Sequence, residues 1–198
     1  MWPDATVFIL GGGPSLRKMP QYPDFECLHD KRVIGVNAAF RLGTWIDVLL
    51  FGDRKFWVWN EKLLKRWPGL KVTNCPNLHN LPGVKHMKRQ SKGLAINPDT
   101  LAFNHNSGSC AINLAIHFGA KNIILLGFDM KCEQEGDGLR HHWHDWHQKE
   151  EKDNIHEIHL GRMKRLAEDI KKTDVNVLNA TPNSAMDYFP MTMLEEWM

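Results

Sequence analysis

Short runs of apolar and β-branched residues alternate along the chain with longer amphipathic segments. The apolar runs predict strands at 6–10, 31–36, 47–51, 71–74, 121–127 and 175–178. Helical periodicity predicts helices at 56–67, 109–118 and 155–172. A short helix is also predicted after each of two turns, the glycine-rich turn at 11–13 and the turn at 181–184. Because strands alternate with helices, we expect an α/β fold with a Rossmann-like, mostly parallel sheet and helices on both faces.

The remaining segments show no clear period. Residues 75–106 are rich in proline and asparagine, so we expect irregular structure with at most short elements there. Residues 131–160 are charged and rich in histidine, and they predict a lid or loop insertion. No repeat or domain boundary is visible, so residues 1–198 are expected to form a single domain.

Composition narrows the class of protein. Apolar residues make up 42% and charged residues 24% of the chain, as in globular proteins, and the net charge of +2 gives little support for nucleic-acid binding. No apolar run is long enough to span a bilayer and no signal peptide is recognised, so we expect a cytoplasmic protein. The four cysteines form no CxxC pair and are expected to be reduced and mostly buried. The chain has eight tryptophans, and a surface that contains some of them could bind a partner or a second copy of the chain, so a homo-oligomer remains an alternative.

Polar and small residues follow several of the predicted strands. In an open parallel sheet the ligand lies beyond the carboxyl ends of the strands, so these residues are expected to converge. The set comprises Gly11, Gly12, Gly13, Ser15, Asn37, Asp53, Ser107, Gly108 and Asp129. A glycine-rich turn before a helix exposes backbone N–H groups that suit a phosphate. Their joint placement favours a nucleotide-type ligand.

Each member of this set also has a simpler interpretation. The glycines can form a plain turn, since the motif is neither G-x-G-x-x-G nor a Walker A loop. Asn37 can be a turn residue, and Asp129 can be a helix cap or a surface carboxylate.

A second group of candidate residues lies in the histidine-rich stretch RHHWHDWH at 140–147. His142 and His144 would share one face of an extended segment, and His144 and His147 one face of a helix. Either pair could bind a metal ion together with Asp145. One of these histidines could instead act as a general base or contact a substrate phosphate. The structural alternative is a solvated loop that is anchored by its tryptophans. His156 and His159 lie at i and i+3 near the start of a predicted helix, and one of them could face the same site.

Several motifs occur here in an order similar to that in bacterial sialyltransferases of family 42. They are VFILGGGPSL (7–16), GVNAAF (35–40), LLFGDRKFW (49–57), NSGSCAINLAIHFGAKNIILLGFDM (106–130) and TPNSAMDYF (181–189). The flagellin-modification and pterin-pyrophosphokinase group resembles the chain more distantly. Small uncharacterised phage-encoded proteins resemble it more closely, through GGGPSL and through segments similar to HHWHDWH and NATPNSAM.

The resemblance to sialyltransferases implies a Rossmann-like fold, a CMP-sugar donor, no required metal and a histidine general base. It implies that the residues at the strand ends line the nucleotide site and that Asn183 and Ser184 lie near the donor phosphate. The base would be His156 or His159, with His144 a further candidate from the same region. One departure is Gly12, where the family has asparagine.

The leading hypothesis is therefore a metal-independent, nucleotide-sugar-dependent glycosyltransferase-like enzyme acting on an unknown hydroxyl acceptor. A metal-dependent pyrophosphokinase or nucleotidyl-type enzyme is the first alternative, and activity in EDTA would separate the two. The second alternative is a non-catalytic phage morphogenesis protein with a degenerate nucleotide fold, which would bind no nucleotide.

Overall fold

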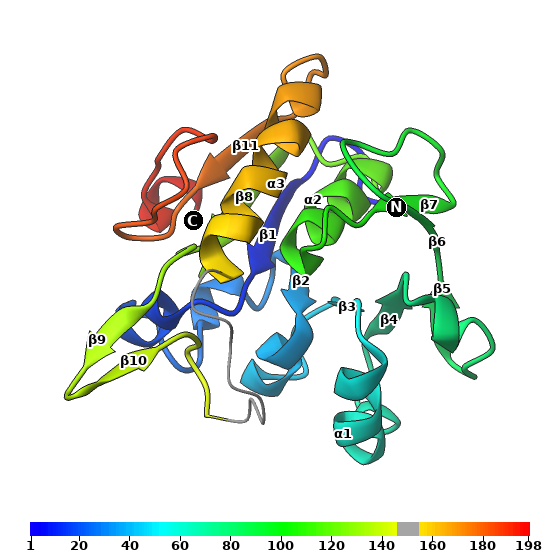
Figure 1. The fold of residues 1–198 in the computed structure, drawn as a ribbon, viewed down its shortest axis with the longest axis horizontal. Coiled ribbons are helices and arrows are strands. Elements are labelled where there is room, and N and C mark those ends of the chain that lie inside the picture. The colour runs from blue at the N-terminus through cyan, green and yellow to red at the C-terminus, as the bar shows by residue number, and fades with distance from the viewer. Residues whose placement is uncertain (146–154) are drawn as a thin grey trace.

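A seven-stranded parallel sheet forms the centre of the computed structural model, which describes residues 1–145 and 155–198 (Figure 1). Its strands stand in the order β11-β8-β1-β2-β3-β4-β5. Their bounds are Thr6–Leu10 for β1, Arg32–Val36 for β2, Val48–Phe51 for β3, Leu70–Thr73 for β4, Val84–His86 for β5, Asn122–Leu126 for β8 and Asn176–Asn179 for β11. The predicted α/β class with a parallel sheet is confirmed.

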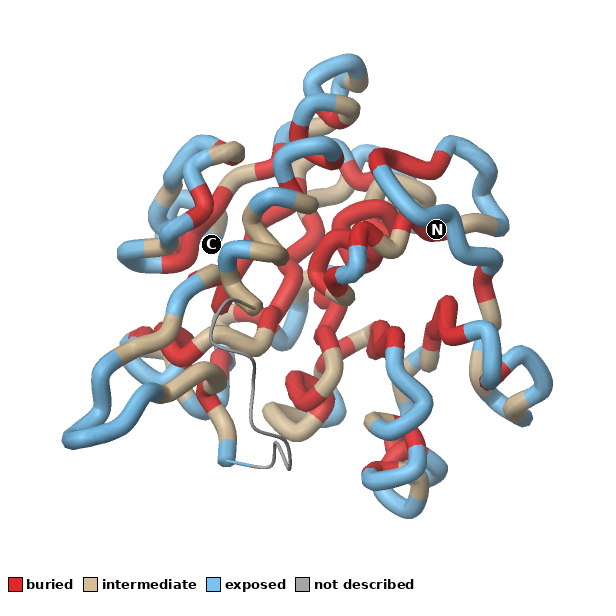
Figure 2. The backbone as a smooth tube through the Cα atoms, in the orientation of Figure 1, coloured by how far each residue is buried: buried red, intermediate tan, exposed pale blue. Residues whose placement is uncertain are grey.

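Helices cover both faces of the sheet, as expected. Alternate side chains of a strand point to opposite faces, so Val7 and Ile9 of β1 pack in the core beneath α2 (Ser107–His117) and α3 (Ile155–Ile170). Phe8 and Leu10 pack on the other face with α1 (Arg54–Leu64) and several short 3₁₀ segments. Figure 2 shows the buried backbone concentrated along the strands and the inner sides of these helices.

The chain changes direction within the sheet at β1. From β1 it runs outward through β2, β3, β4 and β5, and it then returns to place β8 on the other side of β1. The carboxyl ends of β1 and β8 are hydrogen-bonded to each other beyond the strands, since Gly11 N donates to Leu126 O at 2.7 Å and Gly13 N to Gly127 O at 2.8 Å. Such a switch point is where ligands bind in open α/β sheets.

Residues 75–106 form short elements, as predicted. They contain β5, β6 (Lys88–Gln90) and β7 (Thr100–Ala102), each three residues long. Buried Asn113 of α2 fastens this segment, because its Oδ1 accepts from Ala95 N at 3.0 Å and from Ala102 N at 2.9 Å. A further two-stranded antiparallel hairpin, β9 (Glu133–Glu135) and β10 (Gly138–Arg140), lies within the predicted insertion.

A short helix follows the glycine-rich turn, as predicted, and it is the 3₁₀ helix Pro14–Lys18, whose Ser15 N donates to the distant Asp129 side chain. One prediction of a helix was wrong. The turn at 181–184 opens no helix, because Ser184 Oγ donates to Phe128 O and Ala185 N to Asp129 O. The final helical element is instead the 3₁₀ segment Leu194–Trp197.

Among the described residues, no helix has both the length and the apolar character needed to cross a bilayer. The four cysteines are thiols rather than halves of disulfides, two of them buried (Cys75 and Cys110) and two half-buried (Cys27 and Cys132).

Candidate functional site

The glycine-rich turn after β1 packs tightly against the loop after β8. Asp129, only 6% exposed, accepts two hydrogen bonds from Ser15, at 3.0 Å from its N and 2.8 Å from its Oγ. A Cβ on Gly13 would lie 1.8 Å from Asp129 Oδ2, and a Cβ on Gly11 2.5 Å from Gly127 O. Gly12 differs, because a Cβ there would meet only His142 Nδ1, at 3.4 Å. Gly11 and Gly13 therefore serve packing, whereas Gly12 faces the histidine segment.

Burial raises the pKa of the Asp129 carboxyl, although the hydrogen bonds from Ser15 oppose that rise. A raised pKa in the folded state means that folding favours the protonated form. The contribution of this group to stability is therefore greatest at acid pH and is lost as the pH rises through the raised pKa.

Asp129→Asn should remove this pH dependence. The amide stays neutral, its Oδ1 can accept from Ser15 N and its Nδ2 can donate to Ser15 Oγ. We expect the free energy of unfolding of Asp129→Asn to improve relative to wild type as the pH rises from about 4 to 7. Urea unfolding at several pH values measures it, with exposed Asp187→Asn as the control for general loss of charge. A difference that stays constant with pH would contradict the expectation.

Asn37, directly after β2, carries two unfavourable features at once. Its φ is +50°, in the left-handed region, which glycine adopts freely and asparagine at a small cost. Its Oδ1 is buried and accepts no hydrogen bond from any residue in 1–145 or 155–198. An unsatisfied buried acceptor costs about 1–3 kcal/mol. Strain and an unpaired polar atom at the carboxyl end of a strand, next to the switch point, point to a ligand contact.

The ends of β3 and α2 meet at the same edge of the sheet. A Cβ on Gly52 would lie 3.1 Å from Ser107 Oγ, so the end of β3 approaches the first residue of α2 closely. The Asn106 side chain caps α2 by accepting from Gly108 N at 2.7 Å. Asp53 precedes α1 with an exposed side chain that makes no capping bond. Ser107 and Gly108 thus open a helix whose positive end faces the carboxyl edge.

The turn at 181–184 lies against the Asp129 loop. Ser184 Oγ donates to Phe128 O at 2.6 Å and accepts from Met186 N at 3.0 Å, and Thr181 Oγ1 accepts from Phe128 N at 2.9 Å. These bonds join the turn to the end of β8. Asn183, at φ +54°, is exposed beside it.

The histidine segment returns from the β9–β10 hairpin to the glycine-rich turn. Trp143 is buried and donates its backbone N–H to Gly12 O at 3.1 Å, which fixes the segment against the turn. The rings of His142 and His144, on either side of it, stack with centroids 5.2 Å apart. His147 lies outside the described residues. Trp143 is thus a core anchor rather than an exposed stacking surface, and it brings His142 to Gly12.

The N-terminal end of α3 carries His156 and His159. His156 Nε2 lies 3.2 Å from His141 Nδ1, so the helix start meets the base of the hairpin. His159 follows one turn later on the same side of the helix.

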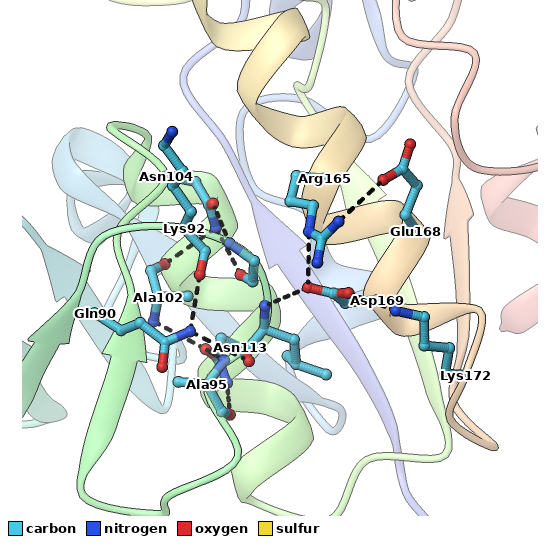
Figure 3. A network of polar contacts seen from close by, with 12 residues as sticks. Gln90, Lys92, Ala95, Ala102, Asn104, Asn113, Arg165, Glu168, Asp169 and Lys172 are labelled. Carbon is cyan, nitrogen blue, oxygen red and sulfur yellow. Dashed lines mark hydrogen bonds and ion pairs between the residues drawn. The ribbon is translucent and has the colours of Figure 1, made fainter.

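A separate cavity of about 790 Å³ lies between α3 and the loops that flank β6 and β7. Lys92, His105, Arg162 and Arg165 are among its lining residues. Figure 3 shows Asp169 at its edge, where its carboxylate accepts from Leu94 N and pairs with Arg165 and Lys172. Desolvation lowers the pKa of His105, and the nearby cations Arg162, Arg89 and Lys92 lower it further. Sequence reasoning missed this cavity, because its cations come from separate segments.

Three-dimensional comparisons find glycosyltransferase structures with the same fold. The sialyltransferase CstII from Campylobacter jejuni, solved in complex with cytidine-5'-monophosphate, aligns with 96% of this chain and 86% of its own, at TM-score 0.53 and 17% identity. The MAf glycosyltransferase from Magnetospirillum magneticum AMB-1 aligns with 97% of this chain and 34% of its own, at TM-score 0.67 and 13% identity. This chain thus spans about a third of the MAf chain. No protein-family model matches the sequence, and a comparison with curated protein sequences finds no match.

Proposed function

We propose that this protein is a glycosyltransferase-like enzyme that uses a nucleotide-sugar donor, with a CMP-sugar as the first candidate. The observation that carries the proposal is the buried Oδ1 of Asn37 at the carboxyl edge of the sheet, near the switch point, which has no hydrogen-bond partner among the described residues. The fold supports the proposal, because it is shared with a sialyltransferase whose structure contains CMP.

The ligand would complete the hydrogen bonding of this edge. An acceptor oxygen needs a donor, and the exocyclic amino group of cytosine or a ribose hydroxyl supplies one to Asn37 Oδ1. The donor phosphate would lie near the positive end of α2 at Ser107 and Gly108, with Gly12 and Asn183 around it, and Asp53 would contact the base. Ser15, Asp129 and Ser184 would act indirectly, because their hydrogen bonds hold the surrounding turns.

In the transfer step, a hydroxyl oxygen of the acceptor bonds to the anomeric carbon of the donor sugar. The bond from that carbon to the phosphate oxygen breaks, and the nucleotide leaves with the electron pair. A histidine takes the hydroxyl proton, which typically contributes about 10²–10⁴-fold in rate. The candidates are His144, His156 and His159. One contact supports His144 as the base: the backbone N–H of Trp143 donates to Gly12 O and holds the segment that carries His144 against the glycine-rich turn. We expect no divalent ion at the donor phosphate.

Asn37→Gly tests the nucleotide site. Glycine adopts φ +50° freely and removes the unsatisfied oxygen, so stability should stay constant or rise by about 1 kcal/mol. CMP affinity should fall about 3- to 10-fold, because a neutral hydrogen bond is worth about 0.5–1.5 kcal/mol. Calorimetric titration with CMP, without added divalent cations, measures the affinity. Asp4→Gly is the matched control, since exposed Asp4 has φ +56° far along the chain from the site.

The other outcomes decide against the proposal. Binding of ATP only in the presence of Mg²⁺ or Mn²⁺ would favour the pyrophosphokinase or nucleotidyl-type alternative. Absence of binding to CMP, UDP, GDP and ATP would favour a non-catalytic protein with a degenerate nucleotide fold. Equal CMP affinity in wild type and Asn37→Gly would remove Asn37 from the site.

A further inference from the structure

Three potential metal ligands meet at the base of the β9–β10 hairpin. In the antiparallel pairing, Arg140 of β10 lies opposite Glu133 of β9. Extending this register by one residue beyond the ends of both strands brings Cys132 opposite His141. The third residue, His156, is the second residue of α3. Cys132 directly precedes β9, His141 directly follows β10, and His156 belongs to α3. Their nearest ligand atoms all lie within 4.8 Å of one another.

Two of the three separations match those around one tetrahedral ion, and the third, between Cys132 and His156, lies within 4.8 Å. Cys132 Sγ lies 3.5 Å from His141 Nδ1, and His141 Nδ1 lies 3.2 Å from His156 Nε2. With Zn–S near 2.3 Å and Zn–N near 2.0–2.1 Å, a tetrahedral ion separates its ligands by about 3.5 Å for S and N and about 3.3 Å for two N atoms. The two imidazole rings stack nearly parallel, with centroids 5.3 Å apart and an interplanar angle of 14°.

We propose that Cys132, His141 and His156 bind a divalent transition-metal ion, with Zn²⁺ as the preferred ion. A thiolate with two imidazoles is a ligand set that favours Zn²⁺ over Mg²⁺ or Ca²⁺, which prefer oxygen ligands. All three residues are half-buried, so water can complete a fourth position. The set differs from His142, His144 and His147, because His141 rather than its neighbours is in register with Cys132.

The ion would fasten the hairpin to α3. The hairpin already contacts the 3₁₀ helix Pro14–Lys18 through the ion pairs Arg17–Glu135 and Lys18–Glu133. The segment after the hairpin is held by the hydrogen bond from Trp143 N to Gly12 O. A metal at Cys132, His141 and His156 would therefore order the segment that carries His142 and His144 over the glycine-rich turn. It would also remove His156 from the candidate bases, because a metal-bound Nε2 cannot take a proton. The proposal stands on ligand geometry and does not depend on the glycosyltransferase function.

The test uses the full chain, stripped with a chelator selective for transition metals and then titrated with Zn²⁺ and with Co²⁺. We expect one ion per chain and a higher melting temperature with Zn²⁺. Co²⁺ should give the visible bands of a tetrahedral ion and a near-ultraviolet charge-transfer band from its thiolate. Absence of one-to-one binding, or a Co²⁺ spectrum without the thiolate band, would overturn the proposal even if the variants below fail to fold.

Cys132→Ser and His156→Ala identify the ligands. Losing partners outside the first coordination sphere commonly costs 10- to 100-fold in metal affinity, so losing a ligand should cost roughly 100-fold or more. Cys132→Ser should also abolish the thiolate band. The matched controls are Cys27→Ser, also half-buried, and His79→Ala, which is exposed. Unchanged affinity in both ligand variants would overturn the assignment. Because these titrations contain no nucleotide, a separate failure to bind CMP would count only against the proposed function.

Discussion

Gly13→Ala should be one of the most destabilising single methyl additions in this fold. The backbone at Gly13, with φ −71° and ψ 152°, suits any residue, so the whole effect is steric. The added Cβ would lie 1.8 Å from Asp129 Oδ2 and 2.7 Å from Gly127 O. Asp129 would have to move away from Ser15 and leave a buried carboxylate without its partners. Overpacking and the unpaired acceptor together cost roughly 2–5 kcal/mol.

Thermal unfolding measures this loss. At about 2–4 °C per kcal/mol for a domain of this size, the melting temperature should fall by about 5–15 °C. Gly12→Ala is the matched control, because its Cβ would meet only His142 Nδ1, at 3.4 Å. We expect the control to change stability by less than about 1 kcal/mol. Equal losses in the two variants would show that the turn needs glycine for its backbone and not for its contact with Asp129.

The sheet could be predicted from sequence because its strands are marked by local pattern. The four residues Ile123–Leu126 are all apolar, and β8 is buried on both faces between β1 and β11. The β9–β10 hairpin has no such mark, because Glu133–Glu135 and Gly138–Arg140 are short and mostly polar. Its pairing is visible only in three dimensions. Since the register of that pairing aligns Cys132 with His141, the proposed metal ligands were hidden from sequence reasoning as well.

The strand-end residues were predicted as a group, but their individual roles depend on long-range contacts. Ser15 and Asp129 are separated by 114 positions, and only the fold shows that they bond to each other. The helix predicted after residue 181 failed for the same reason, because Ser184 bonds to the end of β8 instead of within a helix. The strained backbone and the unsatisfied oxygen of Asn37 likewise have no local signature. Sequence pattern therefore located the edge of the sheet, while packing distinguishes the residues that support this edge from those that would face the proposed ligand.

Replacing the catalytic histidine should reduce turnover more than any other change to the proposed enzyme. If His144 or His159 is the general base, its alanine variant should lose about 10²–10⁴-fold in kcat. CMP affinity should stay within a few-fold of wild type, because the base acts on the acceptor hydroxyl and not on the nucleotide. Steady-state kinetics with a CMP-sugar, paired with calorimetric titration of CMP, separates these two effects. His29→Ala, whose exposed imidazole stacks on Trp45, is the control for loss of a histidine elsewhere.

The three histidine variants together also separate base from metal ligand. His156→Ala should lose the thiolate-bound Co²⁺ spectrum, and its activity should fall only as far as the hairpin segment loses its position. The variant of the true base should keep that spectrum and lose the ascending limb of the pH–rate profile, since that limb reports deprotonation of the base. Full activity in both His144→Ala and His159→Ala would exclude a base at either position. A loss of activity in His156→Ala that persists when the Co²⁺ spectrum is intact would instead identify His156 as the base.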